Sequence, residues 1–120
     1  MTPFRTGFLW HCAAPLSHIR PMSGPAALAV TILDDSWRPR RLLPVRGPWS
    51  AVLPDLLMDE SRWIALMQRR PSDPVAAPRP ADIALTRAII RSLKPLDVRL
   101  ADHLIEARDQ RFSFRDAGLL

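Results

Sequence analysis

The chain has 120 residues, of which 48% are hydrophobic, so it can build one core but is too short for two domains. Its net charge is +5, from 17 basic and 12 acidic residues, and every basic residue except Lys94 is arginine. No basic run exceeds two residues, which argues against a concentrated phosphate-binding patch but leaves an acidic or nucleic-acid partner open.

A single cysteine excludes an intrachain disulfide, and no apolar run approaches the length of about eighteen residues that a membrane helix needs. These features predict a cytoplasmic protein with no membrane partner. We expect residues 1–120 to form one domain, with residues 1–25 as a poorly defined N-terminal segment.

Thirteen prolines confine regular structure to the stretches between them, because proline removes a backbone donor and fixes φ. The apolar run 26–33 predicts a buried strand, and residues 41–46 a weaker strand exposed on one side. Apolar spacing of three and four predicts a helix over 49–59, with Pro54 in its first turns, followed by a short buried strand over 63–67.

The second half of the chain begins with a predicted loop over residues 69–80, which contain four prolines. A clear apolar stripe predicts a helix over 82–93, and residues 98–107 and 111–114 read as two strands around a turn at 108–110. The order strand, strand, helix, strand, loop, helix, strand, strand predicts an α+β domain, a mixed sheet with helices packed on it.

Three segments, PADIALTRAII (80–90), LDVRLADHLI (96–105) and FSFRDAGLL (112–120), resemble the end of RadC-like JAB/MPN (JAMM) domains. That family typically reads His-Asn-His-Pro-Ser-Gly-Asp-Pro, then Ser-x-x-Asp-x-x-x-Thr in a helix, a strand beginning Asp-His, and a terminal Ser-Phe and Gly-Leu-Leu. The resemblance implies a cytidine-deaminase-like architecture. The residues that match the family motif are Pro71, Ser72, Asp73, Pro74, Asp102 and His103.

The resemblance also implies a zinc site, because active members hold zinc with two histidines and an aspartate and use an upstream glutamate as base. Here Gln68 and Arg70 stand at the histidine positions, Arg79 (or Pro80) stands at the serine, and residues 42–52 contain no acid. Asp82 is the only surviving candidate ligand. Because a guanidinium has no lone pair to offer, we expect no catalytic residue, no bound zinc and no other cofactor.

Other side chains leave alternatives open. Either Arg70 or Arg79 pairs with Asp82 in the place of the metal, or all three point into solvent. His103 is expected to be structural. The spacing of His11, Cys12 and His18 fits no common zinc site.

The sequence therefore favours a catalytically inactive JAB homologue that acts as an interaction module, with the loop 69–79 as the surface for an acidic protein or peptide. One alternative is an active zinc metallopeptidase, which would need a different loop alignment or ligands such as His103 or His18. Another is a RadC-type protein associated with DNA repair, for which nucleic acid would be the partner.

Overall fold

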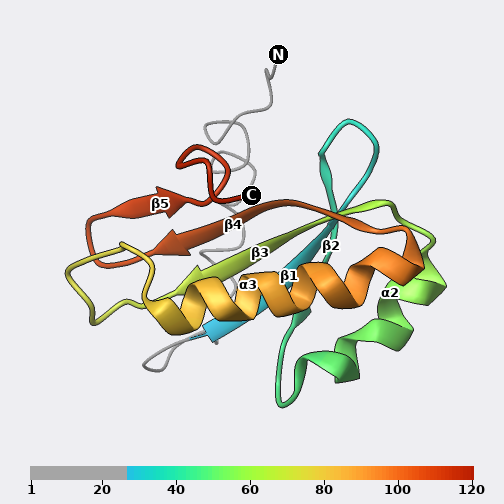
Figure 1. The fold of residues 1–120 in the computed structure, drawn as a ribbon, viewed down its shortest axis with the longest axis horizontal. Helices are drawn as coiled ribbons and strands as arrows, with labels where there is room; N and C mark the ends of the chain where they lie inside the picture. Colours follow the sequence, from blue (N-terminus) through green and yellow to red (C-terminus); the bar gives the residue numbers. More distant parts are fainter. Residues whose placement is uncertain (1–26) are drawn as a thin grey trace.

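A computed structural model describes residues 27–120, so His11, Cys12 and His18 lie outside the described residues. Five strands form one mixed sheet in the order β2-β1-β3-β4-β5 (Figure 1). Their bounds are β1 Ala27–Leu33, β2 Pro39–Pro44, β3 Trp63–Arg69, β4 Arg99–Glu106 and β5 Arg111–Ser113. β3 and β4 run parallel, and every other neighbouring pair is antiparallel. The predicted α+β class is confirmed.

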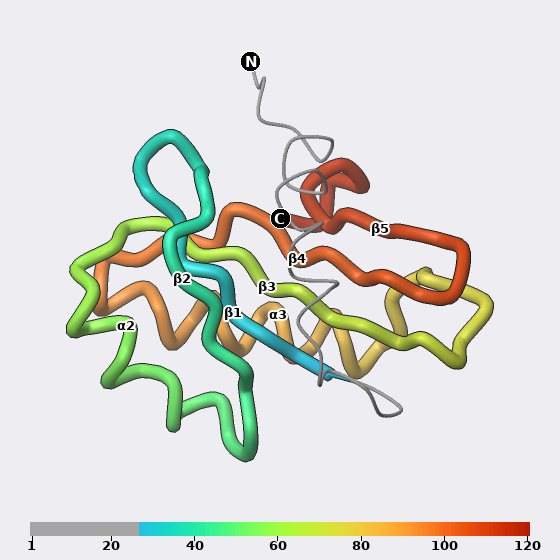
Figure 2. Tube along the Cα trace, turned by 180° about the vertical axis from the view of Figure 1, so that it is seen from behind, coloured from blue at the N-terminus to red at the C-terminus, as the bar shows by residue number. Residues whose placement is uncertain are grey.

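Both α-helices of the described chain cover the same face of the sheet (Figures 1 and 2). The predicted helix 49–59 consists of a 3₁₀ turn, η1 (Trp49–Val52), followed by α2 (Leu53–Asp59), whose first turn contains Pro54. α3 (Pro80–Leu93) starts two residues before the predicted helix, because Pro80 occupies a first-turn position, where a missing N–H costs nothing. A second 3₁₀ turn, η2 (Lys94–Leu96), leads into β4.

Some predicted strand boundaries are wrong by one or two residues. The strand predicted over 41–46 is β2, Pro39–Pro44, and its register is fixed where Leu43 pairs with Val30 of β1. The strand predicted over 63–67 continues to Arg69, and only Ile64–Leu66 are fully buried. The extra length arises because β3 is hydrogen-bonded on both sides as far as Arg69.

The main core lies between the helices and the sheet. Its centre is formed by apolar side chains from both layers, namely Val30, Ile32, Ile64, Leu66, Leu56, Ile89 and Leu93. Among the described residues, no helix is long and apolar enough to cross a bilayer.

The parallel pairing of β3 and β4 sets the position of the candidate site. Leu66 is opposite His103 and Gln68 is opposite Ile105, so the ends of both strands meet at one edge of the sheet. The chain leaves β3 at this edge and returns through a proline-rich loop to the first turn of α3. Residues 68–70, 79–82 and 103 are thereby brought together.

The packing of α3 can be tested with Ile89→Ala, because Ile89 is fully buried in the main core. We expect the substitution to lower the free energy of unfolding by about 3 kcal/mol, since it removes apolar contacts and leaves a cavity. Urea unfolding monitored by tryptophan fluorescence measures this. Met58→Ala, at a side chain 82% exposed, should change it by less than about 0.5 kcal/mol. Equal effects of the two variants would contradict the packing described.

Candidate functional site

The centre of the site is the carboxylate of Asp82 in the first turn of α3. The Arg70 guanidinium forms an ion pair and hydrogen bond with its Oδ2, and both side chains are buried, 6% and 9% exposed. Oδ2 also accepts the backbone N–H of Arg79 at 2.7 Å, and Oδ1 accepts the Gln68 amide at 3.3 Å. The carboxylate therefore caps α3 and pairs with a cation at the same time.

Burial and hydrogen bonding act on Asp82 in opposite directions. Burial raises its pKa, but hydrogen bonds from Arg70, the Arg79 backbone and Gln68 outweigh that effect and leave the pKa below its ordinary value. Asp82 is therefore ionised at neutral pH and permanently opposes the charge of Arg70.

Gln68 connects this ion pair to His103 on β4. The Gln68 amide nitrogen donates to Asp82, so its Oε1 faces His103 Nε2 at 2.9 Å and accepts a hydrogen bond from it. At the other side of the ring, Nδ1 lies 2.6 Å from the Thr86 hydroxyl. The same hydroxyl lies 3.0 Å from the Asp82 carbonyl.

His103 is buried and stacks on Phe114 with 4.4 Å between ring centroids. Burial lowers its pKa to about 4, the charge of Asp82 opposes that shift and the charge of Arg70 adds to it. The ring is therefore neutral at pH 7, with its hydrogen on Nε2, and the Thr86 hydroxyl shares its hydrogen between Nδ1 and the Asp82 carbonyl. Both ring nitrogens of His103 thus face partners inside the domain, and its structural role stays a prediction.

Thr86 is the member of the cluster that the sequence analysis did not single out as a site residue. It is buried and lies one helical turn after Asp82, on the same face of α3. The spacing Asp-x-x-x-Thr of the family pattern was the available signal.

The remaining motif residues in the loop lie outside this cluster. The Arg79 side chain pairs with Asp73 and not with Asp82. Pro71, Ser72 and Pro74 are exposed, although the Ser72 carbonyl accepts a hydrogen bond from the Arg108 guanidinium at 3.0 Å. Of the two arginine pairings considered from the sequence, the structure contains the one with Arg70.

Asp102 points to the side of β4 opposite His103 and serves a different purpose. It is fully buried and accepts the Ser113 hydroxyl at 2.5 Å and the backbone N–H groups of His103 and Arg115 at 2.7 and 3.0 Å. Burial raises its pKa above the ordinary value more strongly than these hydrogen bonds lower it. Asp102 thus anchors the C-terminal turn, residues 114–118, to β4.

The residues at this site do not fit a zinc ion. No group of three or more His, Cys, Asp or Glu side chains within residues 27–120 could hold a metal. Asp82 contributes the only carboxylate of the cluster, and the Gln68 oxygen is turned toward His103. Arg70 fills the remaining position with a fixed cation, and its Nη1 is buried without a hydrogen-bond partner in the described structure.

A five-stranded mixed sheet, with the start of a helix set against the ends of two parallel strands, agrees with the fold of a JAB domain. The family model described as "RadC-like JAB domain" matches residues 49–119, more than half of the chain. The chain therefore belongs to the RadC-like JAB domain family, and the resemblance seen in the sequence is confirmed. JAB-family relatives bind zinc, whereas the side chains described here form no group that could hold a metal ion.

Three curated relatives are similar to parts of this chain. UPF0758 protein BAV2405 of Bordetella avium is 44% identical over 36% of this chain and 19% of its own length. UPF0758 protein Mpe_A2695 of Methylibium petroleiphilum is 48% identical over 38% of this chain and 21% of its own. UPF0758 protein YeeS of Escherichia coli is 39% identical over 48% and 38%. The matches thus span well under half of each relative.

The Arg70–Asp82 pair predicts strong coupling between the two residues. Arg70→Met should lower the free energy of unfolding by about 3 kcal/mol, because it leaves the buried Asp82 carboxylate without its cation. Adding Asp82→Leu should restore only part of that loss, since no charge is then left uncompensated but the Arg79 backbone N–H and the Gln68 amide lose their acceptor. Urea unfolding of both single variants and the double variant measures the coupling, with exposed Arg87→Met as the control. Additive losses would contradict the pairing.

The depressed pKa of His103 predicts a pH dependence. His103 has a pKa of 6.5 in the unfolded chain and of about 4 in the folded chain. Between these pH values the unfolded chain binds a proton at this residue and the folded chain does not, so the free energy of unfolding falls as the pH falls. The imidazole Cε1–H shift in NMR, assigned with His103→Gln, should show a midpoint near 4. In that variant, the loss of stability between pH 6.5 and 4 should be smaller than in the parent. A midpoint near 6.5 would contradict the buried neutral ring.

Proposed function

We propose that this chain is a non-catalytic RadC-like JAB domain that acts by binding another molecule. The observation that carries the proposal is the Arg70–Asp82 ion pair, at the positions where the family places a histidine and an aspartate as zinc ligands. A guanidinium beside the one carboxylate repels a divalent cation and cannot ligate it. The positive charge that zinc would supply comes from the protein itself.

The other polar groups of the cluster also support a non-catalytic role. A JAB-type hydrolase needs a metal-bound water and a base, and a zinc site with an open position provides the first. Both Asp82 oxygens are occupied by donors, and both His103 ring nitrogens face partners within a buried environment. Residues 42–52, where the resemblance places the general base, contain no carboxylate.

The loop 69–79 is a poorer binding surface than its three arginines suggest. Arg69 pairs with Glu106 at 3.4 Å, Arg70 is buried against Asp82, and Arg79 pairs with Asp73. Each positive charge is already opposed by a carboxylate of the chain. An acidic partner remains part of the proposal, but this loop offers it little uncompensated charge.

Metal binding gives the decisive experiment. Protein purified without chelator should contain far less than one zinc per chain, and added Zn²⁺ should leave its melting temperature unchanged, because residues 27–120 offer no ligand set to bind it in the folded state. Elemental analysis and thermal unfolding measure both. Stoichiometric zinc, or a clear rise in melting temperature, would refute the proposal and support a zinc hydrolase.

A variant that rebuilds the ligand set provides the matched positive control. Gln68→His with Arg70→His restores two imidazoles beside Asp82, and we expect the double variant to bind Co²⁺ with the visible absorption of a tetrahedral site. Gln68→His alone should not, because Arg70 still pairs with the carboxylate. Equal binding by the single and double variants would show that Arg70 is not what excludes the metal.

A further inference from the structure

A second group of cations lies at the opposite end of β3 and β4 from the degenerate site. Lys94 follows α3, Arg99 begins β4, and Arg115 lies in the C-terminal turn. Within residues 27–120, none of these three side chains forms an ion pair with a carboxylate, in contrast to the arginines of the loop 69–79. The charges of Lys94 and Arg99 are therefore available to a partner, whereas the charge of Arg115 also acts on the buried Asp102 carboxylate.

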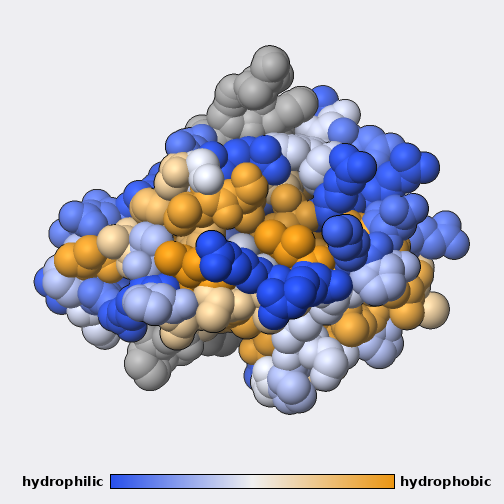
Figure 3. All heavy atoms as spheres, viewed as in Figure 1, coloured by the Kyte–Doolittle hydropathy of each residue, from blue (hydrophilic) through white to orange (hydrophobic). Residues whose placement is uncertain are grey.

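These cations border a groove of about 400 Å³ between α3, the start of β4 and the C-terminal turn. Leu93, Val98 and Leu100 line it with buried apolar side chains, and Ile90 and Leu120 are its more exposed apolar residues. Figure 3 shows apolar surface between α3 and the C-terminal turn, with hydrophilic residues at its border. The groove thus joins an apolar interior to three cations, and among the described residues Asp97 contributes the only acidic side chain to its lining.

Two of the three cations are held in place before any partner binds. The Arg99 guanidinium lies 5.9 Å from the ring centroid of Trp63, and the Arg115 guanidinium lies 5.2 Å from that of Trp37. Arg115 also donates its Nε–H to the Ala101 carbonyl. Stacking fixes these side chains but leaves N–H groups free, so less entropy is lost when an anion binds.

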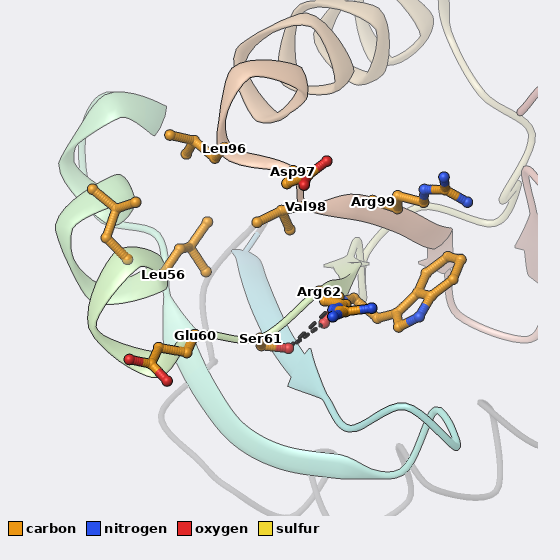
Figure 4. A pocket seen from close by; sticks show the side chains of 10 residues that line it. Leu56, Glu60, Ser61, Arg62, Leu96, Asp97, Val98 and Arg99 are labelled. Atoms are coloured by element: carbon orange, nitrogen blue, oxygen red, sulfur yellow. Dashed lines mark hydrogen bonds between the residues drawn. The ribbon is translucent and has the colours of Figure 1, made fainter.

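A larger neighbouring cavity, of about 550 Å³, shares Asp97, Val98 and Arg99 with the groove (Figure 4). Its other charged residues are Glu60 and Arg62, so its acidic and basic side chains are equal in number. The side chains that line this cavity therefore carry no net charge, whereas those that line the groove carry a net positive charge.

We propose that the groove binds an acidic segment of a partner protein, with an apolar side chain inserted between α3 and β4 and carboxylates paired with Lys94, Arg99 and Arg115. An aliphatic interior suits an apolar side chain, and Trp37 and Trp63 pack on each other and on arginines instead of presenting open faces to nucleic-acid bases. This inference deepens the proposed binding function and rests on it.

The test uses the full chain and a dye-labelled peptide of alternating leucine and glutamate, followed by fluorescence anisotropy. Lys94→Glu should weaken binding about tenfold, because it reverses a charge at the groove. Arg91→Glu makes the same change in net charge on α3 outside the groove and should have a much smaller effect. Ile90→Ser should weaken binding, and Met58→Ser on α2 should not.

Three outcomes would overturn the inference: no binding of the peptide, equal weakening by Lys94→Glu and Arg91→Glu, or tighter binding of a peptide of alternating leucine and lysine. Zinc measured on the same preparation separates this inference from the proposed function. A zinc-free chain that does not bind the peptide would refute only the inference about the groove, whereas stoichiometric zinc would refute the non-catalytic proposal.

Discussion

The buried ion pair between Arg70 and Asp82 sets the arrangement of the edge where β3, α3 and β4 meet. Asp82 is required at the start of α3 because its carboxylate accepts the Arg79 backbone N–H, yet its position inside the domain makes an isolated negative charge costly. In zinc-binding relatives a metal ion can offset that cost. Here a guanidinium does so from within the chain, and it differs from a metal because it leaves no open coordination position for water.

Gln68 is suited to this arrangement because one side chain must donate to Asp82 and accept from His103. An amide can do both, whereas a glutamate at the same length would only accept at neutral pH and would repel Asp82. The hydrogen bonds then continue through His103 to Thr86, linking the end of β3, β4 and α3. Arg70 and Gln68 therefore act together, because the guanidinium pairs with Asp82 while the amide donates to Asp82 and accepts from His103.

The sequence was sufficient for the order of elements, because proline positions and apolar spacing are local signals. It also placed Gln68, Arg70 and Asp82 near one another, through the resemblance to the family. It could not decide between Arg70 and Arg79 as the partner of Asp82. Arg79 lies just before α3, where its backbone N–H reaches Asp82 while its side chain turns to Asp73, and that division depends on how the proline-rich loop closes in three dimensions.

Because the arginines at the carboxyl ends of β3 and β4 are paired with carboxylates, the most accessible positive charge lies at the amino ends of these strands. Ligands of sheets with parallel strands usually bind beyond the carboxyl ends of the strands, and that is where the Arg70–Asp82 pair lies. At that end Arg70 is neutralised by a carboxylate of the chain, whereas at the other end Lys94 and Arg99 have no such partner among the described residues. Long-range attraction of an acidic molecule depends on uncompensated charge and not on the number of arginines. The acidic partner that we propose would thus be attracted mainly at the amino ends of β3 and β4.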